Sequence, residues 1–185
     1  MNDLLILRDA VVGSLRNKLG GGVSVEPHGG TFALEDLKRF ALLAPAVRVA
    51  IVGVGKGSRF NDGRWQVPVH FAAVAITRDA VAPERITRDV GALLLVGALE
   101  LSLASNRFGL EGVRQAEAIE ARNEYSGPVE TMGVALWQVT WTTPVLLGEP
   151  GDPADVVIAH LTKALVNGET YWSQGAGFTG SAEAA

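Results

Sequence analysis

The segment of this chain that comes nearest to a chemical motif is a glycine-rich run, Gly53-Val54-Gly55-Lys56-Gly57-Ser58. A phosphate-binding loop of the Walker type needs four residues between its first glycine and its closing Gly-Lys-Ser/Thr, and this run lacks that spacing. A dinucleotide-binding fingerprint fails too, because the third glycine position holds Phe60 and no helical pattern follows. The run is therefore interpreted as a flexible hairpin tip.

Histidine and serine patterns offer no catalytic or metal-binding set either. The three histidines, His28, His70 and His160, fall in a turn, a strand and a helix, without the paired spacing of metal ligands. Ser-His-Asp catalysis on an α/β fold needs an elbow such as G-x-S-x-G, which is missing. We therefore expect no enzymatic activity, no cofactor and no metal.

An acidic set, Glu117, Glu120 and Glu124, could suggest paired carboxylates or a cation site. These residues lie in a segment, 113–125, that is predicted to be a polar strand. Because side chains alternate along a strand, Glu117 and Glu120 are expected on opposite faces, where they cannot converge. The acidic set is interpreted as a solvated, charged strand face.

Three cations gather in the loop that contains the glycine run. Lys56, Arg59 and Arg64 lie close together in the sequence, beside Asp62. Such a tip could contact a phosphate or an acidic neighbouring subunit. A plain solvated loop is the alternative that the sequence leaves open.

Two long hairpins are expected to form the sheet. In residues 131–147, TMGVALWQVTWTTPVLL, alternation places Ala135, Trp137, Val139 and Trp141 on one face. This pattern predicts a strand that is buried on one side and partly covered on the other. Segments 46–54 and 65–77 alternate in the same way and are joined by a turn-rich link. Pro68 cannot donate a ladder hydrogen bond, so the second of them is expected to be an edge or bulged strand.

The principal helix is expected from about residue 83 to 106. Val90, Leu94 and Leu101 lie on one side, and a second apolar set lies on another side: Leu95, Val96, Leu99 and Leu103. A helix that is apolar all round is buried on all sides, in a core or in an interface.

Helices are also predicted near the two ends and in one short segment between them. The first runs to about Lys18, and residues 34–43 form a shorter one before Pro45. After residue 149 the sequence pattern changes and predicts a helix up to about Val166, followed by a tail with Tyr171, Trp172 and Phe178. The fold class is α+β, with a mixed, mainly antiparallel sheet. Residues 1–149 are expected to form one domain, and residues 150–185 a C-terminal helix and a mobile tail whose aromatic side chains could dock on a partner.

Composition limits the classes of partner. The 185 residues carry a net charge of −4 and no basic run, so bulk electrostatic binding to nucleic acid is not expected. There is no cysteine, which excludes disulfides and thiolate sites. Charges in residues 1–15 argue against a signal peptide, and residues 90–104 are too short for a membrane span. The apolar share of 48% suggests either a large core or burial in an oligomer.

The order of these elements resembles tail-tube terminator and minor tail proteins of tailed phages, and is most similar to the minor tail protein family of Mu-like phages. Three parts of the sequence carry this resemblance over residues 1–149. They are the helix DLLILRDAVVGSLRNKL, the hairpin VRVAIVGVGKG…WQVPVHFAAVAI and the strand GVALWQVTWTTPVLLGE.

The resemblance implies a virion structural protein without catalytic residues. Such proteins assemble in the host cytoplasm as a homohexameric ring at the head-proximal end of the tail. The ring ends polymerisation of the tail tube protein and offers a surface to the head–neck connector or stopper protein, while the genome passes through without sequence-specific binding. Expected ring or partner contacts are Lys56, Arg59, Arg64, Phe108 and Trp172, with loop 56–64 and segment 108–113 at ring contacts.

Two other classes of function stay open. Another neck, connector or baseplate minor tail protein would share the same sequence texture. A small cytoplasmic nucleotide-binding enzyme that uses the glycine run is the weaker alternative.

Overall fold

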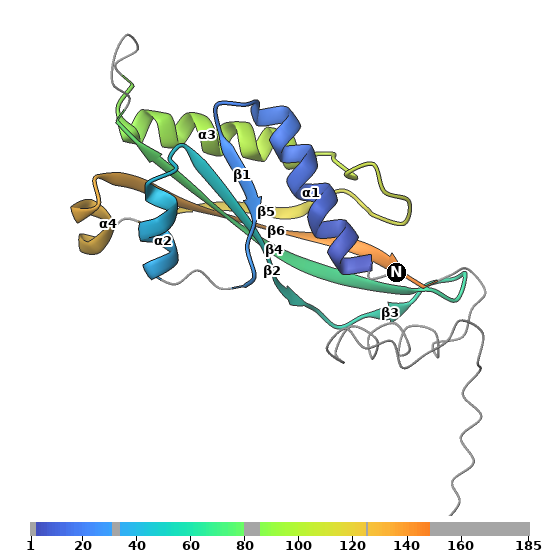
Figure 1. Ribbon diagram of the computed structural model, residues 1–185. Helices are drawn as coiled ribbons and strands as arrows, with labels where there is room; N and C mark the ends of the chain where they lie inside the picture. The colour runs from blue at the N-terminus through green and yellow to red at the C-terminus, as the bar shows by residue number, and fades with distance from the viewer. Residues whose placement is uncertain (1–2, 31–33, 80–85, 125, 149–185) are drawn as a thin grey trace, which may run out of the picture.

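The computed structural model describes residues 3–30, 34–79, 86–124 and 126–148. Within these ranges the chain forms an α+β fold around one mixed sheet, as the sequence predicts (Figure 1). The strands are β1 (Ser24–Pro27), β2 (Ala46–Val54), β3 (Ser58–Arg59), β4 (Trp65–Arg78), β5 (Glu117–Asn123) and β6 (Val134–Leu147). Their order is β1-β2-β4-β6-β5, with β3 paired to β4. Of the strands in the described ranges, only β1 and β2 pair in parallel.

Helices cover both faces of the sheet (Figure 1). The helices are α1 (Asp3–Leu19), α2 (Leu34–Ala41), α3 (Arg88–Leu103) and α4 (Gly127–Thr131). On one face α1 and α3 build the principal core, which includes Leu7, Val11, Leu99 and Leu103. On the other face a smaller cluster forms around Phe40, in the last turn of α2, and Val129 of α4. Within the described residues, the second face is therefore covered only in part.

The long pair of β4 and β6 follows the predicted alternation. Fourteen residues of each strand pair in register, from Trp65↔Leu147 to Arg78↔Val134. The rings of Phe71 and Trp141 stack in the principal core at 5.0 Å between centroids. Val134 and Leu136 point to the opposite face and enter the smaller cluster. The predicted strand, buried on one side and partly covered on the other, is confirmed.

The prediction of an edge strand from Pro68 is wrong, because β4 lies between β2 and β6. Pro68 lies opposite Pro144, and both carbonyl oxygens point away from this pair, accepting from the backbone N–H of Gly55 and Arg114. The two prolines thus form a non-hydrogen-bonded pair, so their missing N–H groups remove no bond between β4 and β6. The bulge lies in β2 instead, where the register shifts between Ile51 and Gly53.

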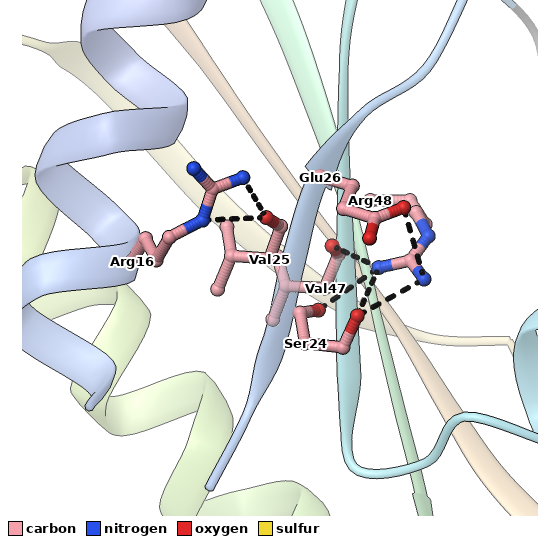
Figure 2. A network of polar contacts seen from close by, with 6 residues as sticks. All are labelled: Arg16, Ser24, Val25, Glu26, Val47 and Arg48. Atoms are coloured by element: carbon pink, nitrogen blue, oxygen red, sulfur yellow. Dashed lines mark hydrogen bonds and ion pairs between the residues drawn. The ribbon is translucent and has the colours of Figure 1, made fainter. Parts of the chain in front are cut away.

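Two arginines fasten the short strand β1 to its neighbours (Figure 2). The Arg16 guanidinium of α1 donates to the Val25 carbonyl oxygen at 2.7 Å. Arg48 is 1% exposed and donates to the carbonyl oxygens of Ser24 and Val47, at 2.9 and 3.0 Å. Its Nη2 lies 3.6 Å from a Glu26 carboxylate oxygen. Burial lowers the pKa of Arg48, and the Glu26 charge opposes that shift.

Other boundaries differ modestly from expectation. The principal helix begins at Arg88, where the Thr87 hydroxyl accepts from the Val90 N–H, and residues 80–85 lie outside the described ranges. The turn expected between the last two strands contains the short helix α4. The predicted helix and tail of residues 150–185 also lie outside the described ranges, so the division into two parts stays a prediction.

Candidate assembly surfaces

The loop of residues 56–64 is ordered by one internal ion pair. Arg64 donates to Asp62 through Nε and Nη2, at 2.8 and 2.6 Å, and its backbone N–H donates to the other carboxylate oxygen. The hydrogen bond from Arg64 holds the pKa of the Asp62 carboxyl below its usual value. Lys56 and Arg59 are exposed. Arg64 therefore shapes the loop, while Lys56 and Arg59 face solvent.

The structure brings this loop beside segment 108–113, the other segment expected at ring contacts. A Cβ on Gly112 would lie 3.6 Å from Nη1 of Arg64, and the Arg114 guanidinium lies over the Phe60 ring at 5.7 Å. Phe108 itself is only 7% exposed and belongs to the principal core. Its side chain therefore supports this segment from within the chain.

Together, residues 56–64 and 107–114 form a surface that we call the basic end. It carries five cations (Lys56, Arg59, Arg64, Arg107 and Arg114) and two acids (Asp62 and Glu111), which gives a net charge of +3. The whole chain carries −4. The basic end is thus opposite in sign to the protein that bears it, as is useful for a contact with an acidic partner.

Helix α3 exposes an apolar stripe on the side that faces away from the core. Its buried residues, Ala92, Leu95, Val96, Leu99, Ser102 and Leu103, share one face. The opposite face holds what we call the α3 stripe: Val90, Leu93, Leu94, Gly97 and Leu101. The four large side chains are 50%, 58%, 62% and 79% exposed. The sequence predicts a helix buried all round, whereas the described part of the chain covers only one side of α3. No helix among the described residues is long and apolar enough to cross a membrane.

A second exposed apolar group lies on the opposite side of the sheet, where α2 ends. We call Lys38, Arg39, Leu42 and Leu43 the α2 knob. Leu42 is 76% exposed and Leu43 is 52% exposed, and both cations are exposed as well. Phe40, between them, points into the smaller core cluster. The knob therefore combines apolar and basic surface on a fixed helix end.

The placement of the acidic strand residues corrects the sequence prediction. Glu117 pairs with Thr142 and Glu120 pairs with Thr140, so the four residues 117–120 of β5 lie opposite the three residues 140–142 of β6. Ala118, within this bulge, has a φ of 51°. The bulge restores Glu117 and Glu120 to the same face, whereas unbroken alternation predicts opposite faces. Both are exposed, and Glu120 pairs with Arg122 at 2.9 Å, as expected for a solvated, charged strand.

The other chemical candidates remain apart. His28 lies 3.8 Å from Asp36, and the His70 ring lies 3.0 Å from the Thr142 hydroxyl on a different strand. No group of three or more His, Asp or Glu in the described part of the chain could hold a metal. His160 and Trp172 lie outside the described residues.

The glycine run lies along β4 as a hairpin connection. Gly55 donates its N–H to the Pro68 carbonyl oxygen at 2.8 Å. A Cβ on Gly57 would lie 2.7 Å from a methyl group of Val67. The glycines therefore permit close contact with β4, which a side chain would prevent.

Sequence reasoning missed several residues of these surfaces. Leu93 belongs to the α3 stripe because it lies three residues after Val90 and next to Leu94. This helical spacing can be read from the sequence. Arg107 and Arg114 join the basic end only through the fold. The sequence places Leu42 and Leu43 at the end of a predicted helix, and no local pattern indicates that they are exposed.

Comparison with known proteins supplies the family. Residues 4–146 match the family model described as Bacteriophage Mu, Gp37. No curated protein sequence matches the chain. Among solved structures, the chain is similar to the sheath/tube terminator of an extracellular contractile injection system (PVC) in its extended state. That likeness has 15% identity and a TM-score of 0.37, and covers 82% of this chain and 59% of the other. This chain therefore spans less than two thirds of the length of the protein it matches. The family match covers most of the sequence and nearly all of the three segments that carry the resemblance to Mu-like phage tail proteins, and it shows this chain to be a member of the Bacteriophage Mu Gp37 family.

Proposed function

We propose that this chain is the tail terminator of a Mu-like phage. In this proposal, copies of the chain form a ring on the last layer of the tail tube, end its polymerisation and offer the surface to which the head–neck complex joins. The observation that carries the proposal is the family match over residues 4–146, which agrees with the order of elements in the sequence. Exposed apolar surface on α3 is the kind of surface that an assembling subunit buries.

The proposed location is the head-proximal end of the virion tail, after assembly in the host cytoplasm. The proposed partners are five further copies of the chain, the tail tube protein and the neck connector or stopper. The genome would pass through the ring without sequence-specific binding. A net charge of −4 suits this passage, because a lining with few cations retains little phosphate.

The basic end is proposed as the part of the ring that meets an acidic neighbour. Lys56 and Arg59 are the exposed cations available for that contact, while Arg64 fixes the loop through Asp62. Phe108 would support the contact from inside the core, and Trp172 would add an aromatic anchor from the C-terminal segment. Electrostatic complementarity of this kind sets partner choice and the rate of association.

Charge reversal tests the basic end. The variant Lys56→Glu/Arg59→Glu should leave the free chain as stable as the parent, because both side chains face solvent, and should lower the phage titre at least tenfold. A matched control is Arg78→Glu, an exposed cation at the far end of β4, which should leave the titre unchanged. A normal titre from the double variant would refute the role of the basic end.

Immunogold electron microscopy tests the location. Antibody against this chain should label purified tails at the end that joins the head. Label at the opposite end would assign the chain to the baseplate and refute the terminator role.

A further inference from the structure

We propose that the α3 stripe is the docking site for the α2 knob of a second copy of this chain. The contact is head to tail, with a different surface used on each side. It rests on the proposed function in one respect, namely that copies of the chain meet in a ring. The choice of these two surfaces follows from their shape, their charge and their positions on the sheet.

Shape is the first argument. The α3 stripe has a gap at Gly97, between Leu93 and Leu94 on one side and Leu101 on the other. Apart from the adjacent residues and the local backbone of α3, no atom of the described residues lies within 4 Å of where a Cβ on Gly97 would be. Glycine in a helix interior lowers stability relative to alanine, and packing among the described residues does not require it. A large side chain from outside, such as Leu42 or Leu43, fits a gap of this kind.

Charge is the second argument, and it favours the α2 knob over a second α3 stripe. Asp89 and Glu100 lie about three helical turns apart, on the same flank of the stripe. The α2 knob places Lys38 and Arg39 beside its two leucines. Docking of the α2 knob on the α3 stripe therefore brings basic side chains close to acidic side chains around an apolar centre. Two α3 stripes packed together would instead bring acidic flanks into one interface, which lacks this complementarity.

Position is the third argument. The α3 stripe lies on the side of the sheet covered by α1 and α3, and the α2 knob lies on the other side (Figure 1). A chain with complementary patches on opposite sides binds the next copy in the same way that it is bound by the previous one. Such heterologous contacts close into a ring where the rotation between copies allows it.

Area sets what else the interface needs. The four large side chains of the stripe expose roughly 400 Å² of apolar surface, which is at the scale of the largest patches on soluble monomers. A specific interface buries about 800 Å² per partner. The stripe thus forms the apolar centre of the contact, and polar surroundings such as Glu100 and Arg39 form its rim.

Site-directed crosslinking tests the contact in the assembled particle. The chain has no cysteine, so introduced thiols react without background from this protein. Tails from phage that carry Leu42→Cys/Leu94→Cys are treated with a short bismaleimide and separated on a denaturing gel. The proposal predicts a ladder of covalent oligomers of this chain. Each single variant, Leu42→Cys or Leu94→Cys, should stay monomeric.

Two results would overturn the proposal. One is a double variant that is present in tails and stays monomeric after treatment. The other is a dimer from Leu94→Cys alone, which would mean that α3 packs against α3 of the neighbour.

Charge exchange keeps the proposal testable if the cysteine variant is not incorporated into tails. Glu100→Arg and Arg39→Glu should each reduce incorporation at least tenfold, and the combination should restore most of it. Lack of restoration would overturn the proposed pairing. Failure of the terminator role would be seen separately, as normal tail length in phage that lack the chain, so the two failures are distinguishable.

Discussion

Leu99 and Leu101 lie two residues apart in α3, and their truncation is predicted to affect different properties. Truncation of Leu99 should lower the stability of the free chain, and truncation of Leu101 should weaken assembly. Leu99 is 0% exposed in the principal core, whereas Leu101 is 79% exposed at the end of the α3 stripe. The two variants, Leu99→Ala and Leu101→Ala, remove the same atoms from the same helix. They differ only in what surrounds those atoms.

For Leu99→Ala, the lost burial and the cavity left in the core should lower the free energy of unfolding by about 3 kcal/mol. In a chain of this length that corresponds to a fall in Tm of roughly 6–12 °C. For Leu101→Ala, the free energy of unfolding should change by no more than about 0.5 kcal/mol, because no core contact is lost. If the ring buries Leu101, its truncation should weaken each subunit contact by about 1–2 kcal/mol, near tenfold in affinity.

Two assays separate these effects. Urea unfolding followed by tryptophan fluorescence measures the stability of the free chain, since Trp141 is 2% exposed and stacks on Phe71. Competition between tagged variant and untagged parent, co-expressed during infection, measures incorporation into tails. A loss above about 1 kcal/mol in free Leu101→Ala would refute the assignment of Leu101 to the outer surface. Equal incorporation of Leu101→Ala and parent would refute its burial in the ring.

Three further predictions concern the loop, the sheet edge and the glycines. The variant Arg48→Met should lower the free energy of unfolding by roughly 1–3 kcal/mol, because the carbonyl oxygens of Ser24 and Val47 lose the hydrogen bonds from Arg48. An unchanged urea unfolding curve would contradict this prediction. The pKa of the Asp62 carboxyl should lie below its ordinary value of about 3.9. The stabilisation from the ion pair with Arg64 is therefore present above the ordinary pKa and is lost as the pH falls through the lowered pKa. In Arg64→Gln the midpoint, followed by carboxyl-carbon NMR, should rise, and an unchanged midpoint would refute the assignment. Gly97→Ala should stabilise the free chain by about 0.5–1 kcal/mol, because alanine favours the helix. Gly57→Ala should destabilise the free chain, because the new Cβ would lie 2.7 Å from a methyl group of Val67. Equal changes in Tm for the two variants would contradict both assignments.

Local patterns in the sequence were sufficient for most of the fold. Alternation along residues 131–147 predicts which side chains of β6 enter the principal core, because one face of a strand must be buried where helices cover the sheet. Apolar spacing likewise separates Leu95, Leu99 and Leu103 from Val90, Leu94 and Leu101. The spacing does not show which of these two sides enters the core and which stays on the outer surface, since both sides of α3 are apolar.

The errors arise where a distant part of the chain decides the outcome. Pro68 is accommodated inside the sheet because Pro144, far along the sequence, lies opposite it. The bulge at Ala118 brings Glu117 and Glu120 to one face, and a left-handed alanine has no sequence signal comparable to glycine. Contact between Arg114 and Phe60 joins two loops that lie far apart in the sequence. The candidate surfaces are thus defined mostly by tertiary structure.

The tail-length distribution in phage that lack this gene tests the central claim most directly. Electron micrographs of lysates should show tails of uncontrolled length, separate from filled heads, and expression of the chain in trans should restore uniform tails joined to heads. Tails of normal length without heads or without tips would assign the chain to the neck or the baseplate. Those tails, or intact particles, would contradict the terminator role.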